Sequence, residues 1–267
     1  MTRWNAMSKN VVYLDFRAAL SAFDKFFYHG ELRTKLNTEK NKKDFVRTRA
    51  PHLKRALDTG MKSLEYRKSE RLHGGVNRVL VEEELAAVGA ILGRKYSEIK
   101  IIRHSLFNCD AFSCFMTTEG LRYTEAFAGS GEFAVVRIVT SVLEAPEKSL
   151  VLLDEPEVSL HPGAQDRLLD FLTTIVKKHK HQVVISTHSP AIVRKLPPEA
   201  IKVLAMDSLS GKVQLPRQSS LADEAFFHLG EPIPGKIFVV VEDILAQAIV
   251  KRALSSEGEA VAALFDV

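Results

Sequence analysis

The sequence predicts an α/β protein with a mainly parallel sheet flanked by helices. Three observations carry this prediction. Between residues 133 and 207, helical patterns alternate with short strand patterns. The strand patterns are nearly continuous apolar runs, which is typical of parallel sheets covered on both faces. The chain of 267 residues is also long enough for one large or two small domains with a buried core.

Each element follows from a local pattern of apolar and turn-forming residues. The predicted strands are 11–16, 98–102, 113–118, 121–127, 149–154, 181–187 and 201–207. The predicted helices are 76–93, 133–143 and 164–178. Two neighbouring strands are expected to form a hairpin around Glu119-Gly120.

Changes in composition divide the chain into parts. Residues 1–207 are expected to form one unit, with a basic helical insertion at about 33–75. Turn-forming residues concentrate at 208–232 and predict a linker. A new strand-then-helix unit is expected at 233–267, where the sequence ends inside a further strand pattern. This ending suggests that the second unit is incomplete.

The composition argues against a membrane-spanning, exported or disulfide-stabilised protein. No apolar run approaches the roughly 18–20 residues of a membrane span. The first ten residues lack the apolar core of a signal peptide. Cys109 and Cys114 have no Cys or His pair nearby, so neither a zinc site nor a disulfide scaffold is expected. We therefore expect a cytoplasmic location.

The formal charge of +4 is unevenly distributed. Residues 33–71 hold 13 Lys or Arg against 5 Asp or Glu, so this stretch is locally cationic. One interpretation is a solvated, partly helical surface arm. The other is a face that meets nucleic-acid phosphate. The sequence leaves both open.

Two acids, Asp154 and Glu155, stand at the end of the apolar segment 149–154. Carboxylates in this position are costly unless they bind something positive. A magnesium ion carrying a nucleotide fits, with Asp154 holding the hydrated ion and Glu155 activating the attacking water. The alternative is a pair of acids at a strand end in solvent.

Two further segments are suited to phosphate. The strand pattern 181–187 ends at His188, which would stand beside Glu155 if the two strands are neighbours. The small-residue loop with Gly129, Ser130 and Gly131 opens directly into a helix, whose first N–H groups favour anions. The alternatives are a structural histidine and a tight turn capped by Ser130 with an acid in the first helical turn.

The order of these motifs resembles a known family. A small-residue loop and helix, a strand ending in Asp-Glu, VSLHP and a strand ending in THSP follow one another. This order is similar to the C-terminal half of ABC-type ATPase heads. More narrowly, it resembles the ATP-binding proteins of the OLD (overcoming lysogenisation defect) group, whose relatives include the SMC and RecF heads. The resemblance is strong over 126–206 and weaker over 76–125.

The resemblance implies ATP and Mg²⁺ as ligands and assigns roles by position. LLDEP corresponds to the family's Walker B motif and STHSP to its switch histidine. Asp154 is then the Mg²⁺-linked acid, Glu155 the catalytic base and His188 the γ-phosphate sensor. These roles are expectations of the resemblance.

The same family supplies two loops. The signature loop, residues 126–131 followed by Glu132, would contact nucleotide through Gly129, Ser130, Gly131 and Glu132. The departure from the family is that Gly129 stands where a serine is common and Ser130 follows one place later. The Ser130 hydroxyl is therefore in doubt as a ligand, whereas the backbone amides are not. The D-loop, which contacts the other subunit, would consist of Ser159, Leu160 and His161.

An ABC head also needs a phosphate-binding G-x-x-x-x-G-K-[ST] loop before the Walker B strand, and the sequence has none there. The near match at 230–237 ends in Ile237 instead of a hydroxyl residue, contains two prolines without N–H groups and leads into a strand. It is not expected to bind phosphate. Either a phosphate loop lies upstream of Met1 in a longer protein, or this is a short subunit that lends its signature loop to a partner.

Residues 236–254 resemble the start of a Toprim nuclease domain. Glu242 fills the glutamate position of the V-E-G-x-x-D pattern, but Asp243 and Ala246 replace the glycine and the aspartate. Glu242 is thus a candidate metal ligand in a longer chain, and this piece alone is not expected to be a nuclease. The alternative is an ordinary strand–helix unit with surface acids.

Together the motifs predict an ATPase module of an OLD-like protein that acts on DNA in anti-phage defence or repair. Its expected partners are a second copy or a subunit with a phosphate loop, DNA, and a nuclease or other defence subunit. The isolated chain is expected to hydrolyse ATP poorly. The alternative is a non-catalytic regulatory or assembly subunit that contributes signature and switch motifs to a partner's nucleotide site. A transporter's nucleotide-binding subunit fits the motifs less well.

Overall fold

A computed structural model describes most of the chain. The described residues are 8–16, 20–33, 39–206, 211–215, 218–222, 225–226, 237–258, 262 and 265–267. Contacts divide the chain into two compact units, Met1–Thr187 and His188–Val267. The predicted linker at 208–232 lies mostly outside the described residues.

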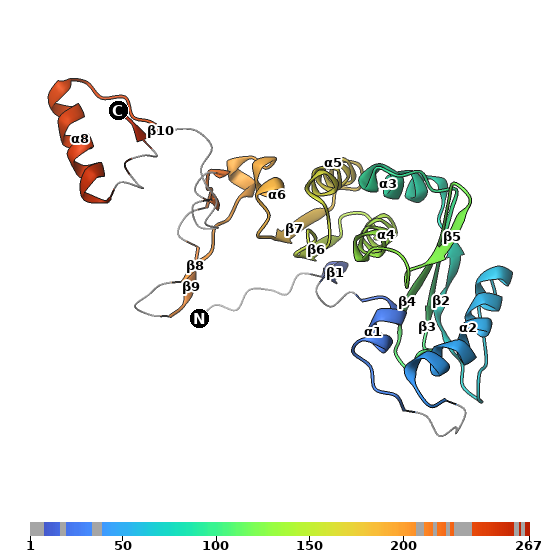
Figure 1. The fold of residues 1–267 in the computed structure, drawn as a ribbon. Helices are drawn as coiled ribbons and strands as arrows, with labels where there is room; N and C mark the ends of the chain where they lie inside the picture. Colours follow the sequence, from blue (N-terminus) through green and yellow to red (C-terminus); the bar gives the residue numbers. More distant parts are fainter. Residues whose placement is uncertain are drawn as a thin grey trace. The chain divides into compact units, whose positions relative to one another are not determined.

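The first unit contains two sheets and five helices in its described residues (Figure 1). Its strands are β1 (Val11–Asp15), β2 (Leu72–Val79), β3 (Glu98–His104), β4 (Ala111–Thr118), β5 (Leu121–Thr124), β6 (Leu150–Asp154) and β7 (Gln182–Ser186). Its helices are α1 (Ala22–Phe27), α2 (Lys42–Thr59), α3 (Glu82–Leu92), α4 (Ser130–Leu143) and α5 (Pro162–His179). The predicted α/β class is therefore confirmed for this unit.

Three strands form the predicted parallel sheet. Their order is β1-β6-β7, so β6 is central and β1 and β7 are the margins within the described residues. The register places Asp15, Asp154 and Ser186 in one row at the carboxyl ends of the three strands. The predicted neighbouring strands 149–154 and 181–187 do pair, and they pair in parallel.

Helices cover one face of this parallel sheet. Leu14, Val151 and Leu153 are buried in one core with residues of α4 and α5. On the opposite face, Val11, Tyr13 and Val184 are 55%, 60% and 56% exposed. The structure differs here from the prediction of two covered faces. Successive side chains of a strand point to opposite faces, and only alternate ones are buried here.

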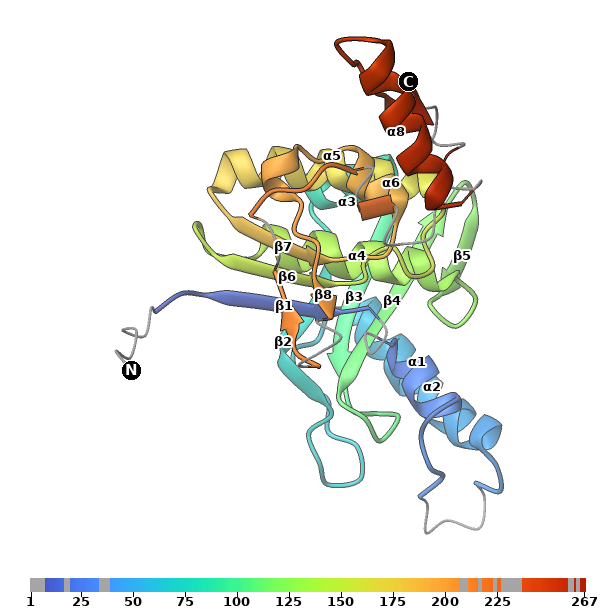
Figure 2. The same ribbon diagram turned by 90° about the vertical axis from the view of Figure 1, so that its left-hand side faces the viewer.

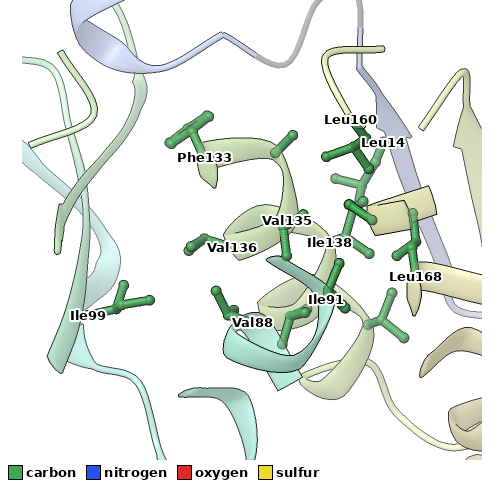
Figure 3. Packing of buried hydrophobic residues seen from close by; sticks show 14 of the residues in the cluster. Leu14, Val88, Ile91, Ile99, Phe133, Val135, Val136, Ile138, Leu160 and Leu168 are labelled. Carbon is green, nitrogen blue, oxygen red and sulfur yellow. The ribbon is translucent and has the colours of Figure 1, made fainter. Parts of the chain in front are cut away.

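Helix α4 is the centre of the main core. Its residues are buried on every side, including Phe133, Val135, Val136 and Ile138, which marks a helix enclosed by other elements. Figure 3 shows these side chains between Leu14 of β1 and residues of α3, β3 and α5. The helix thus joins the two sheets of this unit.

The remaining four strands form an antiparallel sheet in the order β2-β3-β4-β5. The predicted hairpin is confirmed, because Thr118 pairs with Leu121 around a turn with positive φ at Glu119 and at Gly120, where φ is 85°. The second strand of this hairpin is shorter than the predicted 121–127. It ends at Thr124, whose carbonyl accepts the amides of two later residues and so turns the chain.

The predicted helix 76–93 is wrong in its first part. Residues up to Val79 belong to β2, where Asn77 and Val79 pair with β3. The helix begins only at Glu82. The Glu84 carboxylate caps this start by accepting the Val81 amide at 2.9 Å. The apolar residues at the start of this segment, Val76, Val79 and Leu80, have the spacing of a helix face, and pairing with β3 overrides this pattern.

The basic insertion packs against the far face of the antiparallel sheet (Figure 2). In β3, Ile99 and Ile101 belong to the α4 core, whereas Ile102 belongs to a second core with α1 and α2. Phe26 and Phe45 stack there with ring centroids 4.5 Å apart. In its described residues the insertion is therefore folded onto the sheet through α2, whose outer side is exposed.

The second unit contains shorter elements. They are α6 (Pro190–Arg194), a 3₁₀ turn (Pro198–Ala200), β8 (Ala205–Met206), β9 (Val213–Gln214), β10 (Ile237–Phe238), α8 (Ile244–Ser256) and β11 (Phe265–Asp266). The predicted strand 201–207 is mostly wrong. Ile201 is buried in a small cluster with Val193 and Phe226, and among residues 201–206 only Ala205 and Met206 pair, antiparallel to β9.

The last part of the second unit follows its prediction. Strand β10 is followed by α8, and β11 pairs in parallel with β10. A strand, a helix and a parallel strand make the βαβ arrangement expected for 233–267. The strands are only two residues long in the described part of the chain.

Candidate functional site

Polar residues meet at the carboxyl edge of the parallel sheet. Asp15, Asp154 and Ser186 end β1, β6 and β7 in one row, and the Ser186 hydroxyl donates to Asp154 Oδ1. All three present oxygen ligands. Oxygen is the ligand atom that Mg²⁺ takes, commonly from one or two carboxylates together with substrate phosphates. The donor set therefore fits the ion that the sequence implies.

Asp15 was not identified from the sequence. Its strand was predicted, but the pairing of β1 with β6 joins residues far apart in the chain. The available signal was the shared pattern VVYLD and LVLLD, each an apolar strand ending in Asp. The structure adds Asp15 as a candidate second acid at the same edge.

The pKa of the Tyr13 phenol is affected by both acids. The pKa of the Tyr13 phenol is raised by desolvation and then by the negative charges of Asp15 and Asp154. Both carboxylates therefore act on one place in β1. Two acids of like charge side by side favour a cation between or beside them.

Glu155 occupies an unusual backbone conformation. Its φ is 49°, in the left-handed region, and its amide donates to the Ser186 carbonyl at 2.9 Å. Such a conformation costs roughly 1–2 kcal/mol for a residue with a Cβ. It turns the chain sharply at the end of β6, so the second acid leaves the line of the strand while Asp154 stays in it. Strain of this kind concentrates at functional sites.

The turn after β6 is tied to the end of β7. Thr187 Oγ1 donates to Glu157 Oε1 at 2.7 Å. His188 comes next in the chain and is the first residue of the second unit. The structure therefore fixes the residue before His188 against the turn that carries Glu155. The approach of His188 itself to Glu155 stays a prediction.

The three residues that end the signature loop differ in exposure. Gly129 and Ser130 are exposed at the start of α4, whereas Gly131 is buried. A Cβ on Gly131 would lie 2.5 Å from the Ser159 carbonyl oxygen and 3.2 Å from Leu160 Cδ2. The glycine is therefore required for the close approach of this loop to the D-loop of the same chain.

Glu132 is held by three side chains. Its Oε1 accepts from Tyr96 Oη at 2.5 Å, Tyr123 Oη at 2.9 Å and Arg94 Nη1 at 3.0 Å. Burial and the neighbouring Glu132 carboxylate raise the pKa of Tyr96. The other oxygen accepts the Gly129 amide at 3.3 Å. This carboxylate therefore holds the start of α4 in place. From the sequence, Glu132 was expected only as an acid in the first turn of this helix. A contact of Glu132 with nucleotide stays a prediction.

The three D-loop residues differ in exposure. Leu160 is 7% exposed and points into the α4 core (Figure 3). Ser159 is exposed, with φ 70°, and His161 is exposed at the start of α5, where its Nδ1 accepts the Gly163 amide at 3.2 Å. Only Ser159 and His161 are therefore placed to contact another molecule.

Glu242 lies in the second unit just before α8. It is exposed, and the following Asp243 caps that helix by accepting the Ala246 amide at 2.7 Å. In the part of the chain that the structure describes, no group of three or more His, Cys, Asp or Glu side chains is arranged to hold a metal ion. A metal at Glu242 therefore stays a prediction for a longer chain.

Comparison with known proteins gives the family. Residues 14–194 match the family described as "AAA domain, putative AbiEii toxin, Type IV TA system". This match covers more than half of the 267 residues. The chain belongs to this AAA family. The predicted ATPase type is thus confirmed at the level of an AAA domain.

One curated relative of this AAA chain is Protein ea59 of Escherichia phage lambda. The two are 38% identical over 69 residues, which are 26% of this chain and 13% of that protein. The chain therefore spans a small part of the length of this relative.

Two solved structures of SMC proteins are similar to the AAA chain. One comes from work on ATP-driven dimerization and DNA stimulated activation of SMC ATPases. Its TM-score is 0.40 at 15% identity, over 71% of this chain and 96% of that one. The other is the Smc head domain of Pyrococcus furiosus with the C-terminal domain of ScpA. Its TM-score is 0.35 at 16% identity, over 55% and 36% of the two chains.

Among the described residues, no helix combines the length and apolar character needed to span a bilayer.

Proposed function

We propose that this AAA domain binds and hydrolyses ATP at a site shared between two ATPase heads. The observation that carries the proposal is the row of Asp15, Asp154 and Ser186 at the carboxyl ends of three parallel strands, with Glu155 directly after it. Ligands bind outside the carboxyl ends of strands in open α/β sheets. The family match supplies the ATPase type.

The side chains divide the work in this proposal. Asp154, helped by Asp15, holds the hydrated magnesium ion. When bound, the ion neutralises phosphate charge and aligns the phosphates. Glu155 accepts a proton from the attacking water as general base. His188, two residues beyond the end of β7, donates to the γ-phosphate.

The signature loop serves the nucleotide of the other head. Gly129 and Ser130 are exposed at the start of a 14-residue helix, and the Gly129 amide would exchange its bond to Glu132 for one to phosphate. Phe127 of the same loop is 86% exposed, an unusual environment for an aromatic side chain. A second head would cover it. The partner in this proposal is a second copy or a subunit that carries a phosphate-binding loop.

We further propose that the assembly acts on DNA, as an OLD-like protein of anti-phage defence or repair, with a nuclease as a further subunit or domain. The support within this chain is the outer side of α2. Lys43, Arg47 and Lys54 recur at helical spacing on that side, and the side chains of Arg47 and Lys54 are 79% and 78% exposed. Arg47 and Lys54 form exposed ion pairs with Asp44 and Asp58 on their own helix, whereas Arg49 and Arg67 are bound to the buried Glu39.

Neutralising the cations on the outer side of α2 is expected to weaken DNA binding. The triple change Lys43→Gln, Arg47→Gln and Lys54→Gln should lower affinity for duplex DNA and reduce the salt slope by about one unit per lost phosphate contact. Titration at several salt concentrations measures both. The control is Lys177→Gln on α5, an exposed lysine of another helix. Equal slopes for the triple variant and wild type would exclude α2 as the DNA surface.

The second candidate function is a non-catalytic regulatory or assembly subunit. It is favoured by the lack of a G-x-x-x-x-G-K-[ST] pattern in the sequence. ATP hydrolysis separates the two candidates. The chain is assayed with Mg²⁺-ATP in an assembly that also carries a phosphate-binding loop, either its full natural protein or a mixture with such a subunit. A catalytic role predicts that the assembly hydrolyses ATP faster than the partner does alone. A regulatory role predicts that Asp154→Asn changes the rate of hydrolysis no more than the replacement of an exposed acid away from the site does.

A further inference from the structure

A buried carboxyl group stands directly before the signature loop. Glu125 follows β5 and is 6% exposed. Its Oε1 accepts the Ser113 hydroxyl at 2.6 Å and its Oε2 accepts the Cys114 amide at 3.0 Å. Both donors belong to β4. The side chain therefore anchors the start of the loop on the antiparallel sheet.

The hydrogen bonds to Glu125 have a fixed direction. The Leu106 amide donates to His104 Nδ1 at 3.2 Å, so the proton of the neutral ring lies on Nε2. That nitrogen donates to Ser113 Oγ at 2.9 Å, and the hydroxyl must then donate onward to Glu125. The chain of donors ends on the carboxylate. His104 and Ser113 are 0% and 1% exposed, so water does not replace any member.

Burial and hydrogen bonding oppose each other at Glu125. Burial raises the pKa of its carboxyl to about 7, although the Ser113 and Cys114 donors favour the ionised form. Protonation makes one oxygen a donor and so gives up one of the two bonds, but it removes the larger penalty of a buried charge.

The groups around Glu125 do not compensate its charge. From α1, the charge of Asp24 raises the pKa of Glu125 further. From β3, burial lowers the pKa of His104 to about 4, which keeps that ring neutral. From β4, burial raises the pKa of the Cys114 thiol, and Arg137 of α4 acts on that thiol. Glu125 is thus the group of this cluster that titrates near neutrality.

The backbone links Glu125 to the loop. The Glu125 amide donates to the Cys114 carbonyl at 3.1 Å, which continues the sheet by one residue. The Phe127 and Ala128 amides then donate back to Thr124, at 3.0 and 3.1 Å. If Glu125 leaves the sheet, the turn at Thr124 that orients the loop is no longer anchored to β4.

We infer that Glu125 is a positioning residue for the signature loop, residues 126–131. Its neutral carboxyl stays buried on β4 and holds the loop, whereas its ionised form favours an opened loop in which the carboxylate reaches water. The assignment of this loop to nucleotide rests on the proposed function. The positioning itself does not require nucleotide.

Linkage gives the sign of the effect. The pKa of Glu125 is raised when the loop is closed, so closure is favoured at low pH and is lost as pH rises from 4.5 towards 7. With an open-loop pKa near 4.5 and a closed-loop pKa of about 7, the opening equilibrium increases about tenfold between pH 6 and pH 8.

Hydrogen exchange of the full chain without nucleotide tests the loop. After correction for the intrinsic rate, amides of residues 126–131 should exchange about tenfold faster at pH 8 than at pH 6. Amides of α5 serve as the internal reference for global unfolding. In Glu125→Gln, which has the same size and no charge, the corrected loop rates should be equal at the two pH values. A flat wild-type profile, or a Glu125→Gln profile that keeps the slope, would overturn the inference.

A second variant covers the case in which Glu125→Gln does not fold. Ser113→Ala removes a donor that favours the ionised carboxylate, so the pKa rises and the opening profile should move to higher pH. An unchanged midpoint in Ser113→Ala would also overturn the inference.

ATP-dependent head association separates this inference from the proposed function. Association that weakens from pH 6 to pH 8 in wild type but not in Glu125→Gln supports both. Association without any difference between the two profiles overturns the positioning role alone. A lack of ATP-dependent association at every pH, together with the expected exchange profiles, overturns the nucleotide assignment and leaves the positioning role standing.

Discussion

Glu155→Gln is expected to stop ATP hydrolysis while leaving nucleotide binding and head association in place. Glutamine has the shape of glutamate but does not accept a proton from water. General-base catalysis contributes about 100-fold or more to rate, so hydrolysis should fall by at least that factor. The left-handed conformation of this residue depends on the backbone and should persist in the variant. Phosphate release measures the loss, and size-exclusion chromatography with labelled ATP measures the trapped complex.

The matched control for this prediction is Glu147→Gln. Glu147 is an exposed acid shortly before β6, near the amino end of that strand and so at the other end from Asp154. Its replacement should leave both hydrolysis and the lifetime of the complex unchanged. If Glu155→Gln behaves like this control in an assembly that hydrolyses ATP, Glu155 is not the base and the regulatory function is preferred.

Gly131→Ala is expected to destabilise the domain and to separate the signature loop from the D-loop. The new Cβ would lie 2.5 Å from the Ser159 carbonyl oxygen, a backbone atom that is not free to rotate away. Overpacking of this kind costs about 1–3 kcal/mol. The higher helix propensity of alanine would by itself stabilise α4 by up to about 1 kcal/mol, so a net loss reports the clash. Urea unfolding measures the free energy, and ATP-dependent association should fall with it.

Gly129→Ala is the control for the stability measurement. This position has φ −64° and ψ 146°, which alanine adopts readily, and no other described residue lies within 4 Å of the added Cβ. Alanine is a poorer N-cap residue than glycine, so the free energy of unfolding should fall by roughly 0.5–1 kcal/mol, with no contribution from a clash. If the two alanine variants lose equal stability, the contact between Gly131 and Ser159 is not the cause.

The centre of the fold was predictable because its patterns are local. Strand β6, helix α5 and strand β7 follow from apolar runs bounded by turn residues, and the parallel pairing follows from the helix between the strands. Strand β2 was not, since Val76 and Val79 stand three residues apart, which places them on one face of a helix but on opposite faces of a strand. Its identity depends on β3, a partner that a local pattern does not specify.

The candidate site divides in the same way. Asp154 and Glu155 are adjacent in the chain and were recognisable by that adjacency. Asp15 is brought to them only by the pairing of β1 with β6. The contacts that fasten the signature loop come from remote segments as well, with Tyr96 on Glu132 and Ser113 on Glu125. Side chains gathered from separate strands leave no fixed spacing in the sequence.

Strand β7 forms one margin of the three-stranded sheet in the described residues. Backbone groups at the margin of a sheet can pair with an added extended segment in parallel or antiparallel direction. Growth of the sheet there would rely on peptide groups alone. It would therefore tolerate changes of surface side chains and added salt, and recruitment through β7 would differ in this respect from binding through the cationic side of α2.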